Sequence, residues 1–279
     1  MGDKIRLGIV ILAWNSEKVI DKCLSSVNEL KEFSPAVVII NNGSTDSTPE
    51  ILEKYVKGNS GVFSVIEKKK NMGTTVTRNQ GIKKLLKQGM DYICILDSDT
   101  EVNDGAFLLL TEEMKKNPAY GLIGPTLVTS GGVVQMSARA FPTALEKLYK
   151  AIPIKSVQKK GEALEIQKPP HPGITSYPVD YLMSACWLVK PEVFRKAGLL
   201  DEKIFYAPED AEYCIRVWKA GWQVAFCPDA RIIHEWQRLS KKKLISRINF
   251  EHIKGLIHMF IKHRYLFSAR KLRNKFIKE

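Results

Sequence analysis

The stretch YICILDSDTEV, residues 92–102, joins an apolar run to a cluster of carboxylates. The run has the length and composition of a buried strand, and it leads directly into Asp97, Ser98 and Asp99. A buried strand would give the two carboxylates a fixed platform at its tip. A surface turn can carry such a pair by chance, so their role depends on the rest of the chain.

Three further runs of strand length precede this stretch, and helical patterns separate them. We expect strands at residues 5–14, 36–40, 62–67 and 92–96. Between them, apolar residues recur at helical spacing over 19–30, Thr48 followed by Pro49 predicts the N-cap and first residue of a helix, and a further helix is expected over 74–88. Strands that alternate with helices predict an α/β fold with a mainly parallel sheet flanked by helices.

The second half of the chain resumes this alternation after a long interruption. A helix is expected after Asp104, then strands at 121–128, 181–189 and 222–226 and helices at 191–196 and 208–220. From 129 to 180 the sequence carries Pro and Gly without a regular period, so we predict an irregular insertion. Insertions of this length in compact domains usually serve a function.

Length and composition indicate a globular chain of 279 residues, 44% of them hydrophobic, which is enough for a sizeable core. No apolar run reaches the roughly 18 residues that span a bilayer, and the first residues lack a cleavable signal, so we expect a cytoplasmic protein. The five cysteines are odd in number and form no CxxC pair. We therefore predict buried reduced thiols rather than disulfides or a zinc site.

Positive charge is concentrated at the end of the chain. Residues 240–279 contain twelve Lys or Arg and two Glu, a surplus of ten in a chain whose net charge is +13. Apolar residues at helical spacing accompany them, including Ile245, Ile248 and Ile253. Such helices can lie on an anionic membrane surface, or they can pack on the rest of the protein with a solvated basic face. Nucleic-acid binding is not expected, because no RNA- or DNA-binding motif accompanies the charge.

Polar clusters follow three of the expected strands: Asn15 after the first, NNGSTD at 41–46 after the second and DSD at 97–99 after the fourth. The carboxyl ends of parallel strands form the edge at which ligands bind in open α/β sheets. GxGxxG and GxxxxGK[ST] motifs are absent, so a dinucleotide dehydrogenase or a P-loop NTPase is not expected. Two carboxylates one residue apart suit Mg²⁺ or Mn²⁺, and a metal-bound diphosphate is the predicted ligand.

Several blocks together resemble the inverting family 2 glycosyltransferases of the GT-A fold, in particular the rhamnosyltransferase-like branch that extends bacterial and archaeal surface glycans. The resemblance runs over residues 6–236. The blocks that carry it are LAWNSEKVIDKCLSSV, VVIINNGSTDSTPEIL, NMGTTVTRNQGI, ILDSDTEV and the long run from VDYLMSACWLV through APEDAEYCIRVW to CPDARIIH. Their order along the chain makes the set specific.

The resemblance implies a role for residues at the sheet edge. The implied donor-binding residues, with Arg78 near the diphosphate, are Ala13, Trp14, Asn15, Asn41, Asn42, Asp46, Arg78, Asp97 and Ser98. Asp99 would be the more direct ligand of a Mg²⁺ or Mn²⁺ ion, with Asp97 and His234 beside it. Asp210 matches the general base of the family and Glu209 its neighbour. A base is needed because a sugar hydroxyl is a poor nucleophile.

The same residues also have structural explanations. Glu209 and Asp210 stand at a predicted helix start, where acids are favoured by the helix dipole and by capping. His234 could be a satisfied polar residue on an apolar strand, and Arg216 a salt-bridging helix residue. Two positions depart from the family pattern: Asn41 stands where an acid is common, and Ser184 where Gly is common.

These patterns predict a catalytic domain at 1–238, with nucleotide-sugar binding over 1–128 and the acceptor side and base over 129–238, followed by a basic helical extension at 239–279. The expected reaction is the transfer of a sugar, with inversion, from a UDP-, dTDP- or GDP-sugar to a glycan or lipid-linked acceptor. The product would serve surface polysaccharide or glycolipid biosynthesis. The expected location is the cytoplasm or the inner face of the cell membrane. The alternatives are a sugar-1-phosphate nucleotidylyltransferase and a non-catalytic membrane-associated adaptor on a transferase scaffold.

Overall fold

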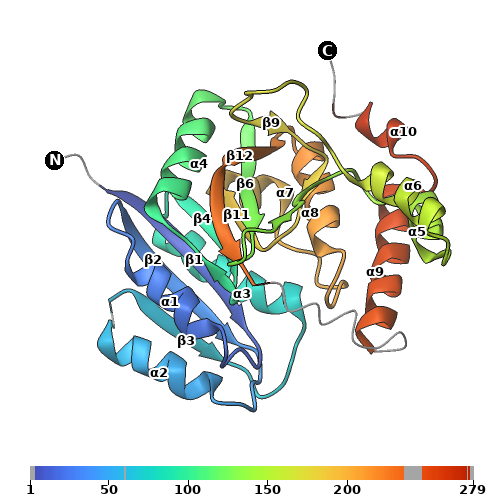
Figure 1. The fold of residues 1–279 in the computed structure, drawn as a ribbon. Helices are drawn as coiled ribbons and strands as arrows, with labels where there is room; N and C mark the ends of the chain where they lie inside the picture. The colour runs from blue at the N-terminus through green and yellow to red at the C-terminus, as the bar shows by residue number, and fades with distance from the viewer. Residues whose placement is uncertain (1–3, 60, 236–246, 275, 277–279) are drawn as a thin grey trace.

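The computed structural model describes residues 4–59, 61–235, 247–274 and 276, which form a large mixed sheet with helices on both faces (Figure 1). The strands of the sheet stand in the order β3-β2-β1-β4-β11-β6-β12-β5, with β7 paired to β6 and β9 to β12. The strand bounds are β1 Ile5–Ala13, β2 Phe33–Asn41, β3 Phe63–Glu67, β4 Tyr92–Asp97, β5 Thr100–Glu101, β6 Tyr120–Val128, β7 Val134–Gln135, β8 Ala138–Arg139, β9 Tyr177–Pro178, β10 Tyr181–Leu182, β11 Cys186–Val189 and β12 Gln223–His234.

Most of the helices lie in two layers, one on each face of the sheet (Figure 1). Their bounds are α1 Ile20–Asn28, α2 Thr48–Gly58, α3 Thr74–Gln88, α4 Asp104–Lys116, α5 Ala144–Ala151, α6 Lys155–Glu165, α7 Pro191–Ala197, α8 Glu209–Lys219, α9 Arg247–His263 and α10 Arg270–Arg273. Apolar side chains of α1, α2 and α4 pack in one core, and those of α3, α7, α8 and α9 pack in another. Successive strand residues point to opposite faces, so Ile9 of β1 joins the first core and Val10 the second.

The strands β1 to β4 are parallel, as the sequence predicted, and their register fixes the ligand edge. Leu12 of β1 lies opposite Asp97 of β4, and Ala13 lies opposite Asn41 of β2. Antiparallel β11 sits between β4 and β6, and β12 runs parallel to β6. The three polar clusters therefore meet at one edge of the sheet.

Three predictions about local structure are wrong. The expected strand at 181–189 is divided into β10, which pairs with β8 in a separate two-stranded sheet, and β11, which pairs with β4. Thr48 is the first residue of α2 rather than its N-cap, which is Ser47. The Thr48 hydroxyl accepts a 2.8 Å hydrogen bond from the Ser16 backbone N–H instead of capping its own helix. Residues 129–180 are not irregular throughout, because they contain α5, α6 and short strands.

The described part of the C-terminal extension packs against the rest of the chain. Met259 is fully buried, and Tyr265 and Leu272 are buried in the second core. Lys262 of α9 lies 2.6 Å from an Asp201 oxygen and 2.7 Å from a Glu212 oxygen. The segment therefore packs on the protein, which was one of the two expectations for it. Ile245, which was part of its predicted apolar pattern, lies outside the described residues.

The cysteines agree with the expectation from composition. All five cysteines are buried and unbonded to one another. Among the described residues, no helix combines the length and apolar character that crossing a bilayer requires.

Candidate functional site

A cavity of about 550 Å³ opens at the carboxyl ends of the parallel strands. The predicted site residues that line it are Trp14, Asn42, Arg78, Asp97, Ser98, Asp99, Glu209, Asp210 and His234. These residues are up to 220 positions apart in the sequence. They lie on the loops after β1 and β2, on α3, on β4 and the turn after it, on the first turn of α8 and at the end of β12. The fold therefore gathers most of the predicted set around one space.

Four predicted donor-binding residues do not line this cavity: Ala13, Asn15, Asn41 and Asp46. Ala13 is fully buried in the first core. The Asn41 amide donates to Glu67 at 2.7 Å, and its oxygen accepts from the Ser44 N–H. Both hydrogen-bonding sides of Asn41 are thus engaged within the protein.

Asn15 and Asp46 hold the two loops in shape. The Asn15 side chain accepts from the Thr45 N–H at 2.8 Å, and its own backbone is left-handed with φ 49°, which Asn tolerates better than most residues. Asp46 accepts from the N–H groups of Glu17 and Thr48. These contacts tie the loop after β1 to the loop after β2.

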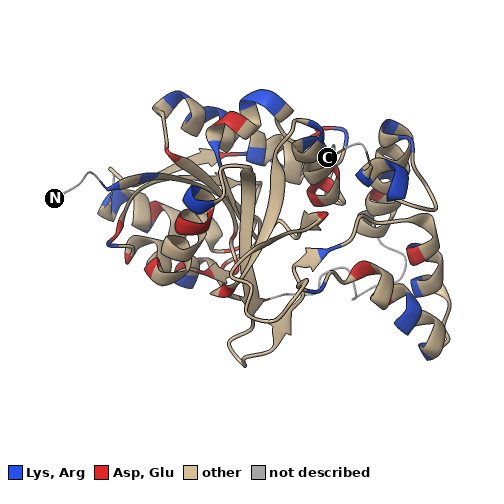
Figure 2. Cartoon of the chain, turned by 90° about the horizontal axis from the view of Figure 1, so that it is seen from above, with Lys and Arg blue, Asp and Glu red and all other residues tan. Residues whose placement is uncertain are grey.

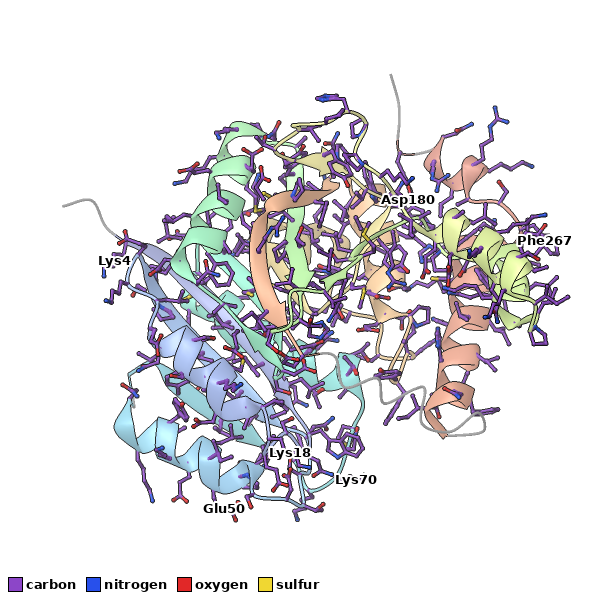
Figure 3. All side chains as sticks on the ribbon, viewed as in Figure 1. Lys4, Lys18, Glu50, Lys70, Asp180 and Phe267 are labelled. Carbon is purple, nitrogen blue, oxygen red and sulfur yellow. The ribbon has the colours of Figure 1, made fainter. Side chains whose placement is uncertain are left out.

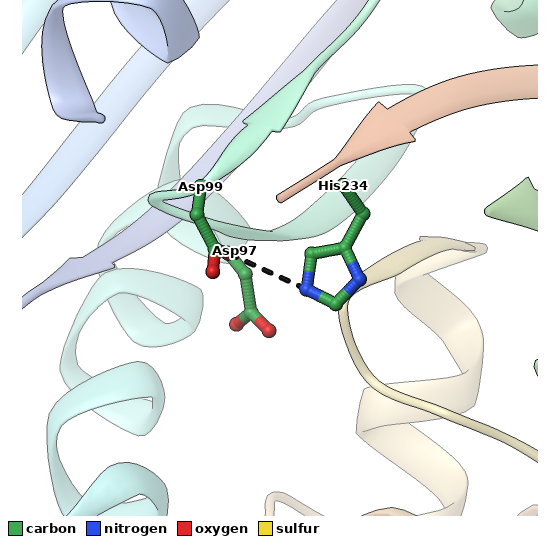
Figure 4. A group of neighbouring side chains, drawn as sticks. All are labelled: Asp97, Asp99 and His234. Atoms are coloured by element: carbon green, nitrogen blue, oxygen red, sulfur yellow. Dashed lines mark ion pairs between the residues drawn. The ribbon is translucent and has the colours of Figure 1, made fainter. Parts of the chain in front are cut away.

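Asp97, Asp99 and His234 form a group that could hold a metal ion (Figure 4). One ligand atom from each lies within 4.8 Å of the others, and His234 Nε2 is 3.4 Å from an Asp99 oxygen. The short strand β5 brings them together, because Thr100 pairs with His234 at the end of β12. Two carboxylates and an imidazole form a donor set that fits Mg²⁺ or Mn²⁺.

Gln135 on β7 orients His234, and the sequence reasoning missed it. The Gln135 amide nitrogen donates to the His234 carbonyl at 2.8 Å, so the amide oxygen must face the ring and accept from Nδ1, 2.7 Å away. With the proton on Nδ1, the lone pair of the neutral ring is on Nε2, the atom that faces Asp99. Metal-binding histidines in proteins are commonly held by such a partner.

The charge balance of this group depends on its burial. Burial disfavours an imidazolium, but the hydrogen bond and charge of Asp99 and the charge of Asp97 outweigh it and raise the pKa of His234. Burial also raises the pKa of Asp97, against the Arg78 charge. A cation would offset the repulsion between the two neighbouring carboxylates.

Arg78 links the two ends of the cavity. Its guanidinium is buried at the start of α3 and donates to Asp97 at 2.5 Å, to Glu209 at 3.1 Å and to Ser184 Oγ at 2.9 Å. Ser184 in turn donates to Glu209 at 2.8 Å. The Ser184 hydroxyl therefore bridges Arg78 and Glu209.

The start of α3 is fixed to the loop before α8. Gly73 adopts φ +85°, and an added Cβ there would lie 2.5 Å from the Phe205 carbonyl oxygen. The same carbonyl accepts from the Thr74 N–H at 2.7 Å. This close approach sets the distance between Arg78 and the acidic pair that follows Phe205.

Glu209 and Asp210 face the cavity from the first turn of α8, and they differ in their surroundings. Burial and the charge of Asp210 raise the pKa of Glu209 to about 8, although Arg78 opposes the shift. Burial also raises the pKa of Asp210, whose Oδ1 accepts from the adjacent Ala211 N–H at 2.7 Å. The N-cap of the helix is Pro208, and Asp210 satisfies one N–H group of the first turn, so a structural role at the helix start accounts for part of its position. Arg216 is the salt-bridging residue, paired with Glu212 and outside the cavity lining.

Further residues on the cavity wall were not predicted. Ile248 and Glu251 of α9 line it together with Phe205 and Tyr206. Gly255 lets α9 approach, because a Cβ at that position would lie 2.3 Å from the Ala207 carbonyl oxygen. The C-terminal extension therefore completes the cavity.

Gln135→Leu is expected to weaken Mn²⁺ binding by roughly 10–100-fold, because the ring of His234 loses the bond that fixes its tautomer. Titration of Mn²⁺ against the purified variant measures this. Gln88→Leu, an exposed helix position, serves as the matched control. Equal Mn²⁺ affinity in Gln135→Leu and in wild type would rule out this role for Gln135.

Comparison with known proteins agrees with this geometry. The model of the family described as glycosyl transferase family 2 matches residues 8–195. The N-acetylglucosaminyl-diphospho-decaprenol L-rhamnosyltransferase of Mycobacterium tuberculosis is 23% identical over 276 residues, covering 92% of this chain and 85% of the relative. That relative and this chain thus correspond over most of both lengths.

Solved structures share the fold. The structure of GalNAc-T7 with UDP, GalNAc and Mn²⁺ superposes with a TM-score of 0.69 at 17% identity over 93% of this chain, which spans 48% of that protein. Residues 1-349 of S. aureus TarS in complex with UDP-GlcNAc give a TM-score of 0.61 at 15% identity, over 98% of this chain and 70% of that one. The mixed sheet is that of the GT-A fold. The chain therefore belongs to glycosyl transferase family 2 and is a glycosyltransferase of the GT-A fold.

Proposed function

We propose that this enzyme transfers a sugar, with inversion, from a nucleoside-diphosphate sugar to a glycan or lipid-linked acceptor in surface polysaccharide or glycolipid biosynthesis. One observation carries the proposal: the group Asp97, Asp99 and His234 and the carboxylate Asp210 face the same cavity. One group can bind the diphosphate through a cation, and the other can take a proton. Family membership favours a transferase over a nucleotidylyltransferase or a non-catalytic adaptor.

In this proposal the chain divides into functional parts. Residues 1–128 would bind the nucleotide sugar, 129–238 would supply the acceptor side and the base, and 239–279 would form the extension. The donor would lie against Trp14 and Asn42, with its diphosphate near Arg78, Asp97 and Ser98. Ala13, Asn15, Asn41 and Asp46 would act by shaping the two loops rather than by touching the donor.

The reaction is a single displacement. An acceptor hydroxyl attacks the anomeric carbon, the bond from that carbon to the diphosphate oxygen breaks, and Asp210 takes the hydroxyl proton. Arg78, a cation of the cavity wall paired with Asp97, would stabilise the charge that the leaving diphosphate gains. Mg²⁺ or Mn²⁺ held by Asp97, Asp99 and His234 would stabilise that charge as a Lewis acid.

Glu209 would have a positioning role. Burial and the charge of Asp210 raise its pKa, which makes it a weaker candidate for a charged base at neutral pH. On the cavity wall, its bonds to Arg78 and Ser184 hold it beside the base. Asp210, which lacks those partners, is the better proton acceptor for a bound acceptor hydroxyl.

Support for a metal-dependent nucleotide-sugar donor comes from the donor set and from the GalNAc-T7 structure, which contains UDP and Mn²⁺. The rhamnosyltransferase relative is named for a diphospho-decaprenol substrate, which favours a lipid-linked acceptor. We also propose that residues 240–279 contact an anionic membrane surface at the inner face of the cell membrane. Its residues 240–246 lie outside those described.

Thermal unfolding with UDP-, dTDP- and GDP-sugars, each with and without Mn²⁺, tests the proposal. One nucleotide class is expected to raise the Tm by several degrees only when the metal is present, because binding to the folded state alone stabilises it. Mg²⁺ in place of Mn²⁺ then identifies the preferred ion. A chain whose Tm responds to none of the three donors with either metal would not be the proposed transferase.

A further inference from the structure

Helix α9 has two apolar sides. One side faces the protein: Met259 is fully buried and Gly255 touches the Ala207 carbonyl. The other side faces away from it. We call its residues the outer stripe: Phe250, Ile253, Ile257 and Ile261, whose exposed fractions are 67%, 57%, 54% and 73%. Spacings of three and four residues place these side chains on one side of the helix, opposite Met259.

Exposed apolar residues continue beyond the end of α9. Leu266 and Phe267 are 44% and 68% exposed, and the Leu266 carbonyl accepts from the Ala144 N–H at the start of α5. Figure 3 shows Phe267 projecting beside α5 and α6. On α5 itself, Leu148 is 57% exposed. Apolar side chains exposed in such number on neighbouring elements usually mark an interaction surface.

The charges around this surface are mostly positive (Figure 2). Lys254 and Arg264 flank the outer stripe, and further exposed cations lie on the neighbouring helices: Lys155, Lys159, Lys160, Arg270 and Lys271. Between 247 and 274 the sequence has one acidic residue, Glu251, which lines the cavity, and α6 carries the exposed Glu162 beside its three exposed lysines. An apolar stripe with basic flanks matches an anionic lipid surface.

Two other occupants fit less well. A second copy of the chain would bring two basic surfaces together, which is electrostatically unfavourable. A nucleic acid would use the cations but would leave the aliphatic side chains of the outer stripe without a partner. Lipid satisfies both the apolar side chains and the charges.

The position of α9 connects this surface to the site. Ile248 and Glu251 line the cavity, while Phe250, between them, is exposed on the outer stripe. The two surfaces are thus separated by the thickness of one helix, roughly 10 Å. On the basis of the proposed function, we propose that the outer stripe docks on the anionic surface of a lipid bilayer and holds the cavity where a lipid-linked acceptor can enter.

Binding to vesicles tests this proposal. Phosphatidylcholine vesicles with and without about one-third phosphatidylglycerol are sedimented with the full chain. Wild type is expected to bind the anionic vesicles more tightly, and less tightly as salt is raised. The double variant Ile257→Glu with Ile261→Glu is expected to bind them at least roughly tenfold more weakly, since both side chains leave the apolar phase.

The matched control introduces the same charge elsewhere. Leu108 and Leu109 on α4 are 36% and 39% exposed and belong to the opposite layer of the fold. Leu108→Glu with Leu109→Glu is expected to bind vesicles as wild type does. All three proteins should bind nucleotide sugar and metal equally; absence of donor binding in all three, wild type included, would count against the proposed function and not against docking.

The proposal is overturned if wild type leaves the anionic vesicles unbound, or if the α9 and α4 double variants bind them equally. Gel filtration tests the remaining alternative, in which a second copy of the chain occupies the outer stripe. A wild-type dimer that becomes monomeric in the α9 variant would identify the outer stripe as a self-association surface and would also overturn lipid docking.

Discussion

Asp210→Asn is expected to lower kcat by roughly 10²–10⁴-fold while leaving the fold and donor binding unchanged. The amide keeps the shape of the carboxylate, and its oxygen can still accept from the Ala211 N–H as Oδ1 does. It cannot take the proton of the attacking hydroxyl. Product formation at saturating donor measures the loss.

Asp229→Asn is the matched control for this variant, because Asp229 is an exposed residue of β12 outside the cavity lining. Its kcat should equal that of wild type. The Tm of Asp210→Asn shows whether the variant is folded. If the folded variant still turned over donor and acceptor at the wild-type rate, the assignment of the base would be refuted.

Asp99→Asn is the second substitution with a large expected effect. It removes a charged oxygen from the group that faces His234 at 3.4 Å. We expect kcat/KM to fall by roughly 10²–10³-fold, because the charge of the departing diphosphate loses its counter-ion. Mn²⁺ titrations in the presence of donor measure the weakened affinity.

The metal dependence separates this effect from misfolding. Without metal, wild type and Asp99→Asn should bind the donor alike, and Asp229→Asn should follow wild type in both conditions. If the Asp99→Asn protein retained the full Mn²⁺ dependence of donor binding, the ion would have to lie elsewhere.

The parallel half of the sheet could be predicted because its information is local. Each of β1 to β4 is a short apolar run, polar clusters follow β1, β2 and β4, and parallel pairing sends all four carboxyl ends to one edge. Asp97 ends β4 and Asp99 lies two residues beyond it, so their position at that edge follows from the strand alone. Their partners Asp210 and His234 came from the family resemblance, because no local pattern shows that distant segments meet.

Residues that act through tertiary contacts escaped prediction. Gln135 lies on a strand of two residues, too short to show a period, and its role depends on pairing with β6 beside β12. The amphipathic pattern of α9 predicted a helix, but it could not show that Ile248 and Glu251 would face the cavity. Which side of such a helix is covered depends on the surface against which it packs.

The helices within 129–180 did leave a signal. Thr143 and Glu146 stand three residues apart before an apolar pattern, which is the capping-box spacing. In the structure the Thr143 hydroxyl accepts from the Glu146 N–H at 3.2 Å, at the start of α5. The Pro and Gly residues on either side of this segment obscured the pattern.

The central claim is that the metal ligands and the general base lie on separate sides of one cavity. Its most direct test is to measure donor binding by Asp99→Asn and Asp210→Asn. Each variant is titrated with Mn²⁺ and the nucleotide sugar that wild type prefers. Asp210→Asn is expected to bind the donor with wild-type, metal-dependent affinity, and Asp99→Asn to lose that metal dependence. Equal loss in both variants, or wild-type binding in both, would contradict the assignment of metal and base to separate sides of one site.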